Sequence, residues 1–137
     1  MDRTFDIDQA NAALEAVAPL LATLADQRLE LIRLRDRTLA SSPAGPDGAG
    51  DVDEEEARRL RLRMQGVIDQ MAAAVAQIDT LGITLRDIER GLIDFPATSP
   101  SGRTYLLCWL EGEESIDWWH WPEDGFAGRT PITEPPD

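Results

Sequence analysis

Residues 60–87, LRLRMQGVIDQMAAAVAQIDTLGITLRD, contain the change of hydrophobic period on which the fold depends. Up to residue 78 the apolar positions recur every three or four residues, which is typical of an amphipathic helix. Gly82 then ends this pattern, as glycine commonly does just beyond a helix. From Ile83 to Asp87 apolar and polar residues alternate, which predicts a strand. The helical stripe consists of Leu60, Met64, Val67, Met71, Val75 and Ile78.

An earlier segment has the same helical period. Asp6 and Gln9 have the spacing of a capping box, so we expect a first helix over residues 7–39. The stretch 40–52 is rich in glycine, proline and other small residues, which predicts a flexible loop before a second helix over residues 53–81. Two apolar stripes joined in this way predict a long antiparallel helical hairpin. The first stripe consists of Ala10, Leu14, Val17, Leu21, Leu24 and Leu31.

The second half of the chain predicts a small antiparallel sheet of three to four strands over residues 83–121. A C-terminal loop and tail over residues 122–137 should follow it. The fold class is therefore α+β, and a length of 137 residues suits a single domain over 1–137. The predicted strands are 83–87, 91–95, 104–110 and 116–121.

The last two predicted strands form a β-hairpin whose register depends on its turn. A two-residue turn at Gly112 and Glu113 would place residues opposite each other when their numbers add up to 225. Alternation along the strand would also send Asp117 and His120 to opposite faces of the sheet. The expected pairs are Tyr105 with His120, Leu107 with Trp118, Trp109 with Ile116, and Cys108 with Asp117.

Charge and composition exclude several classes of function. The 26 acidic and 13 basic side chains give a net charge of −13, which disfavours nucleic acid and anionic membrane surfaces as partners. We see no apolar leader and no run of about 20 apolar residues, so we expect no membrane association and a cytoplasmic location. Cys108 is the only cysteine, which fits a reducing compartment and excludes an intramolecular disulfide.

Functional side chains concentrate near the end of the last predicted strand. A ligand or metal site would centre on His120 and recruit Asp94, Glu123 or Asp124, with Arg129 as a cationic partner. The alternative for His120 is a hydrogen-bonded structural histidine, and that for Arg129 is an ordinary ion pair with a carboxylate. We therefore predict no cofactor, with a divalent metal as the alternative. The alternative function is a small-molecule-binding or metal-dependent enzyme with its site at this edge of the sheet.

The leading prediction from the sequence is a non-enzymatic, homo-oligomeric protein-interaction domain. Two helices of about 30 residues would extend beyond a small sheet and leave apolar positions uncovered, which predicts a homodimer or higher oligomer through the helices. Four tryptophans near the C-terminus could also present an aromatic surface to a protein partner. The candidate interface residues are Trp119, Trp121, Leu20, Leu34 and Ile68.

Two further classes of function find less support. Cys108 lies among leucines in a predicted central strand, so we expect it to be buried rather than an activated nucleophile. Eight arginines fall in the outer half of the predicted hairpin and suggest an RNA-probing tip. Acidic residues lie among them, so ion-paired helix surfaces are the simpler interpretation.

Several motifs together resemble one known family. The chain is similar over nearly its whole length to the uncharacterised bacterial proteins grouped as domain of unknown function 2203. The resemblance implies no activity. In that family an acidic residue often follows the Trp-His pair directly, whereas here Trp121 and Pro122 intervene, which argues against a carboxylate ligand next to His120. The resemblance rests on Thr4-Phe5, Ala10-Asn11, the segment 87–96, Leu107-Cys108-Trp109, Trp119-His120 and the segment 125–132.

Overall fold

The structure is a computed structural model, and it describes residues 3–41 and 54–137. Helix α1 (Ile7–Ser41) and helix α2 (Glu54–Thr80) form the predicted hairpin. The predicted capping box begins α1, since the Gln9 amide donates to Asp6 Oδ1 and the Asp6 amide donates to Gln9 Oε1. Most of the predicted loop 40–52 lies outside the described residues. None of the described helices has the length and apolar character needed to cross a bilayer.

Five antiparallel strands follow the hairpin as a meander, each paired with the next along the chain. The sheet therefore has one strand more than the three to four predicted. The additional strand, β5, lies in the segment predicted as tail and pairs with β4, with Trp119 opposite Thr130. The strands are β1 (Thr84–Asp87), β2 (Leu92–Thr98), β3 (Thr104–Leu110), β4 (Trp118–His120) and β5 (Thr130–Pro131).

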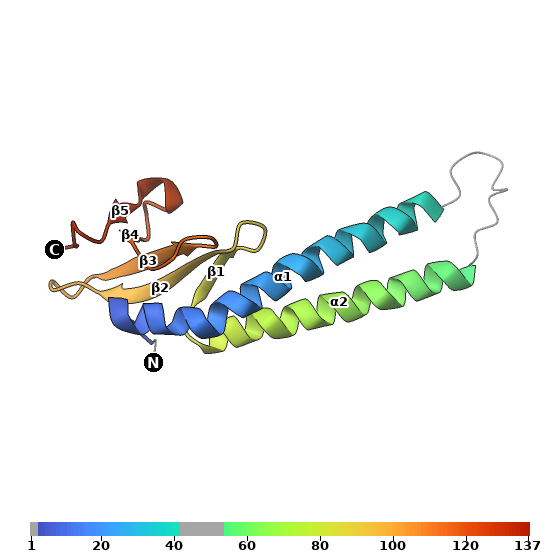
Figure 1. Cartoon of the computed structure of the whole chain (residues 1–137), viewed down its shortest axis with the longest axis horizontal. Coiled ribbons are helices and arrows are strands. Elements are labelled where there is room, and N and C mark those ends of the chain that lie inside the picture. The colour runs from blue at the N-terminus through green and yellow to red at the C-terminus, as the bar shows by residue number, and fades with distance from the viewer. Residues whose placement is uncertain (1–2, 42–53) are drawn as a thin grey trace.

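One face of the sheet packs on the inner ends of the two helices, and the outer ends continue beyond the sheet as an arm (Figure 1). On this face Phe95 is fully buried and its ring meets Phe5 edge to face, with centroids 5.3 Å apart. The Phe5 amide donates to the Pro96 carbonyl, which holds the N-terminal segment against β2. The main core residues are Val17, Leu21, Leu24, Ile78, Ile93, Phe95, Leu107, Trp109, Ile116 and Trp119.

The predicted register of the β3–β4 hairpin is wrong by one residue. His120 lies opposite Leu106, rather than Tyr105. The physical reason is that residues 111–117 form a longer connection in place of a two-residue turn. In this connection the Glu113 carboxylate accepts a hydrogen bond from the Leu110 amide, and the Glu113 backbone carbonyl accepts one from the Trp109 indole. Because side chains alternate with a period of two, this shift moves His120 to the opposite face relative to β3.

The second face of the sheet is also covered. A chain of rings and guanidinium groups joins the β1–β2 turn to the C-terminal segment and to β4. Arg90 lies 4.6 Å from the ring centre of Phe126, Arg129 lies 4.7 Å from the same ring, and Arg129 lies 5.0 Å from the Trp118 ring. Phe126 belongs to η1, a short 3-10 helix over Phe126–Gly128.

Phe95 provides a test of this core. The Phe95→Ala substitution should lower the free energy of unfolding by about 3–5 kcal/mol, because it opens a cavity against Phe5 and the helices. Urea unfolding followed by circular dichroism measures this difference. Phe126→Ala is the matched comparison, since Phe126 is 37% exposed and its truncation removes mainly the stacking of Arg90 and Arg129, at a cost of about 1–2 kcal/mol. Equal losses for the two variants would contradict the core described above.

Candidate functional site

Three buried side chains from three adjacent strands meet on the second face of the sheet. Asp94 on β2 lies opposite Cys108 on β3, and the observed register places His120 on β4 on the same face. The exposed fractions are 1% for Asp94, 0% for Cys108 and 3% for His120. One oxygen of Asp94, the sulfur of Cys108 and one ring nitrogen of His120 all lie within 4.8 Å of one another. We call these three residues the polar cluster.

Hydrogen bonds fix the orientation of the His120 ring. Nδ1 lies 2.8 Å from the carbonyl oxygen of Trp121. Because a carbonyl oxygen only accepts, Nδ1 carries a hydrogen and donates it. The other nitrogen, Nε2, faces Asp94 Oδ1 at 3.1 Å. His120 is therefore held from both sides and directs Nε2 into the polar cluster.

Arg86 connects the polar cluster to the surface. Its Nε donates to Asp94 Oδ2 at 2.7 Å, whereas Asp94 Oδ1 faces His120. A register shift between Leu85 and Asp87 locally interrupts the β1–β2 pairing at this position. The Arg86 side chain is 47% exposed and that of Asp94 only 2%. One arginine side chain thus leads from solvent to the buried carboxylate.

The environment of Cys108 keeps its thiol protonated. Burial first, and the neighbouring Asp94 carboxylate second, raise the pKa of the Cys108 thiol to about 12. A hydrogen bond from the thiol to Asp94 acts in the same direction. The expectation that Cys108 is buried is therefore confirmed.

Arg129 lies beside the polar cluster but has a different partner. Its Nη2 donates to both carboxylate oxygens of Glu113, at 2.8 and 2.9 Å. The same nitrogen lies 3.5 Å from the Cys108 carbonyl oxygen, and the guanidinium stacks on Trp118 and Phe126. Glu113 thus neutralises Arg129 and links it to the connection that sets the β3–β4 register.

The other two candidate ligands lie elsewhere. Glu123 is exposed and forms an ion pair with Arg103 on the surface. Asp124 is also exposed, beside Gly128. The structure thus brings Asp94 to His120 but not Glu123 or Asp124. Reasoning from the sequence missed Cys108 as a neighbour of His120, because the predicted register placed the two on opposite faces, and it missed Arg86 as a partner of Asp94.

The predicted interface residues divide into buried and exposed groups. The expectation that Trp119 and Leu34 are exposed is wrong, since their exposed fractions are 6% and 2%. Trp119 packs between Tyr105 and Trp121, and its indole donates to the Glu134 carbonyl. Leu20 and Trp121 are partly buried against the core. Ile68 remains 42% exposed on α2.

Four large apolar side chains of the arm are exposed in the part of the chain that the structure describes. Two leucines of α1 and two apolar residues of α2 have exposed fractions between 42% and 65%. Near the sheet, a shallow groove of about 480 Å³ runs between α1 and α2 and is mainly apolar. The exposed residues are Leu29, Leu39, Leu62 and Ile68, and the groove is lined by Ala16, Leu20, Ala76, Gln77, Thr80 and Leu81.

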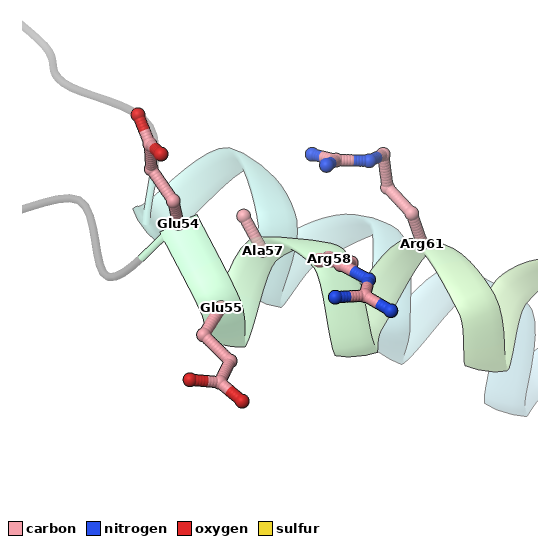
Figure 2. Close-up of a pocket in the computed structure, with 5 residues that line it drawn as sticks. All are labelled: Glu54, Glu55, Ala57, Arg58 and Arg61. Carbon is pink, nitrogen blue, oxygen red and sulfur yellow. The ribbon is translucent and has the colours of Figure 1, made fainter.

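A second hollow lies at the outer end of the arm. It is lined by Glu54, Glu55, Ala57, Arg58 and Arg61, at the start of α2. Figure 2 shows that these side chains point in different directions rather than toward one centre. The arrangement is that of a charged helix surface, without the converging groups of a ligand site.

The buried ion pair of Asp94 should contribute far more to stability than the surface pair of Glu123. We expect Asp94→Ala to lower the free energy of unfolding by about 2–3 kcal/mol, because it removes the charged hydrogen bond from Arg86 and leaves a gap beside the buried His120 ring. Glu123→Ala should cost about 1 kcal/mol or less, because its pair with Arg103 is exposed. Urea titration of both variants tests this difference, and losses of the same size would show that the polar cluster is not a closed network.

Cys108 should be inert in the folded protein. A thiol that is buried and protonated should react with a disulfide reagent at pH 8 only through unfolding, because the thiolate is the nucleophile. Ellman's reagent should thus label the native chain at least about 100-fold more slowly than the chain in 6 M guanidinium. Rapid labelling of the native protein would contradict the burial of Cys108.

The arm and the polar cluster lie within a segment that matches a known family. A family model described as an uncharacterized conserved protein, DUF2203, matches residues 3–132. Comparison with curated proteins and with solved structures gives no significant match. The match runs from the N-terminal segment beside β2 to the residue after β5, and thus includes both helices and all five strands. The chain therefore belongs to the DUF2203 family of uncharacterized conserved proteins.

Proposed function

We propose that this chain is a non-enzymatic interaction domain that assembles with copies of itself through the helical arm. The observation that carries the proposal is the set of exposed apolar residues on the arm, Leu29, Leu39, Leu62 and Ile68. A contiguous exposed apolar patch marks an association surface, and we propose that these residues belong to one such patch. The occupant that we propose is a second copy in antiparallel orientation, related by a two-fold axis.

Charge along the arm supports the antiparallel orientation. The outer half, residues 28–41 and 54–66, contains eight arginines and five acidic residues. The inner half, residues 7–27 and 67–80, contains five acidic residues and no basic residue. Two arms lying antiparallel would place the net positive outer half of each on the net negative inner half of the other. Such complementarity favours this arrangement over a parallel one.

Shape supports the same arrangement. The groove lined by Leu20 and Leu81 lies on the inner half of the arm. The exposed side chains Leu29, Leu39 and Leu62 lie on the outer half. In an antiparallel pair these leucines would reach the partner's groove, so apolar surface would meet apolar surface on both sides of the axis. Each copy would provide both surfaces, which closes the assembly as a dimer.

Sedimentation equilibrium tests the proposal. The full chain should be a dimer at micromolar concentration, and the dissociation constant should rise with ionic strength because screening weakens the contacts between oppositely charged halves. The double variant Leu29→Ser/Leu62→Ser should weaken the dimer by at least about tenfold. Phe126→Ser is the matched control, because Phe126 is exposed but lies outside the arm.

Charge reversal tests the orientation. Arg33→Glu/Arg61→Glu on the outer half should weaken the dimer about tenfold, the equivalent of about 1.4 kcal/mol. Adding Glu15→Arg and Asp79→Arg on the inner half of the same chain should restore it. A parallel dimer would show no such rescue. A monomer at micromolar concentration, or a monomer whose arm retards RNA in low-salt gels, would refute self-association.

A further inference from the structure

We propose that Asp94, Cys108 and His120 bind one divalent metal ion of the zinc type. This site is separate from the arm surface and does not depend on self-association. Its ligands would be Asp94 Oδ1, Cys108 Sγ and His120 Nε2, from β2, β3 and β4. One carboxylate oxygen, the sulfur and one ring nitrogen of these residues already lie within 4.8 Å of one another. Among the described residues this set offers one oxygen, one sulfur and one nitrogen from a single buried face.

The donor set indicates which metal the site would take. Zn²⁺ is bound in proteins by cysteine sulfur, histidine nitrogen and carboxylate oxygen. Mg²⁺ and Ca²⁺ prefer shells made only of oxygen, so they should not compete at this site. Three protein ligands leave a fourth position of a tetrahedral shell for water or another small ligand.

The hydrogen bonds around the polar cluster leave the ligand atoms directed inward. His120 donates its Nδ1 hydrogen to the Trp121 carbonyl, which is the partner typical of a metal-bound histidine. Arg86 binds Asp94 Oδ2 at 2.7 Å and leaves Oδ1 directed at His120. Oriented carboxylate and imidazole ligands of this kind characterise metal sites whose outer shell is already built.

Distances also fit an ion between Asp94 and His120. Because the His120 hydrogen is on Nδ1, the lone pair of His120 Nε2 faces Asp94 Oδ1 at 3.1 Å. Two hydrogen-bond acceptors at this distance need a proton or a cation between them. An ion about 2.0–2.1 Å from each atom in a tetrahedral shell would hold the two about 3.3 Å apart. Zn²⁺ binds cysteine sulfur at about 2.3 Å, so in the bound state Cys108 Sγ should lie about 3.6 Å from the other two ligand atoms.

Charge and access are consistent with this assignment. Binding would replace the thiol proton, so that Cys108–SH and M²⁺ give a metal thiolate and one released proton. The two negative ligands, Asp94 and the Cys108 thiolate, would balance the charge of the ion. Arg86 is 47% exposed, so its side chain can move aside for entry and can bind Oδ2 again afterwards. Arg129 pairs with both carboxylate oxygens of Glu113, which offsets part of its positive charge beside the site.

Cobalt provides a direct test on the full-length chain. After dialysis against chelator, the protein should bind one equivalent of Co²⁺ and develop an intense near-ultraviolet absorption from thiolate-to-metal charge transfer. Zn²⁺ should bleach this absorption stoichiometrically, and Mg²⁺ should not. Zn²⁺ should also raise the midpoint of thermal unfolding, because it binds the folded state. Cys108→Ser should abolish the charge-transfer absorption, and Arg86→Gln should weaken binding by about 10–100-fold.

Asp87→Asn is the matched control, because Asp87 is an acidic residue next to Arg86 that lies outside the polar cluster. Its Co²⁺ affinity should equal that of the unmodified chain. If Cys108→Ser does not fold, X-ray absorption at the zinc edge of the unmodified protein replaces that variant as the test. The spectrum should show one sulfur ligand at about 2.3 Å from the zinc. Co²⁺ that binds without thiolate absorption, or a zinc shell of oxygen alone, would mean adventitious binding by surface carboxylates and would overturn the proposal.

Discussion

The register between β3 and β4 is the constraint on which the second face of the sheet depends. Glu113 sets this register. Its carboxylate accepts a hydrogen bond from the Leu110 amide, and its backbone carbonyl accepts one from the Trp109 indole. The same carboxylate neutralises Arg129, whose guanidinium lies over Trp118 on β4. A single side chain thus joins the β3–β4 connection to the C-terminal segment, and its position decides which residues share a face with Cys108.

Each face of the sheet has a different covering. The helices cover the face of Phe95 and Trp109 with apolar side chains, and this face forms the hydrophobic core. The other face is covered by arginines and aromatic rings around a buried carboxylate, thiol and imidazole. This division leaves most of the arm outside the core, so that Leu29 and Leu62 have no cover among the described residues.

Local patterns in the sequence predicted much of this fold, because helix periodicity and capping depend on neighbours along the chain. The hairpin, the capping box at Asp6 and four strands are of this kind. The β3–β4 register depends instead on a long-range set of contacts around Glu113, and a turn rule applied to Gly112 and Glu113 could not include them. The same error separated His120 from Cys108, so reasoning from the sequence chose Glu123 and Asp124 as metal candidates beside His120 and Asp94 and left out Cys108. β5 has only two residues and depends on pairing with β4, which explains why periodicity did not indicate it.

The continuity of α1 has a structural consequence. The helix runs without interruption for 35 residues, or about 52 Å, from the sheet to the outer end of the arm. Near its start, Asn11 Oδ1 accepts a hydrogen bond from the Ile116 amide, within the connection that sets the β3–β4 register. Pro19 lies between this anchor and the arm, and its missing backbone N–H removes one hydrogen bond from the helix there. One continuous helix therefore carries both the outer end of the arm and a contact to the segment that aligns His120 with Cys108.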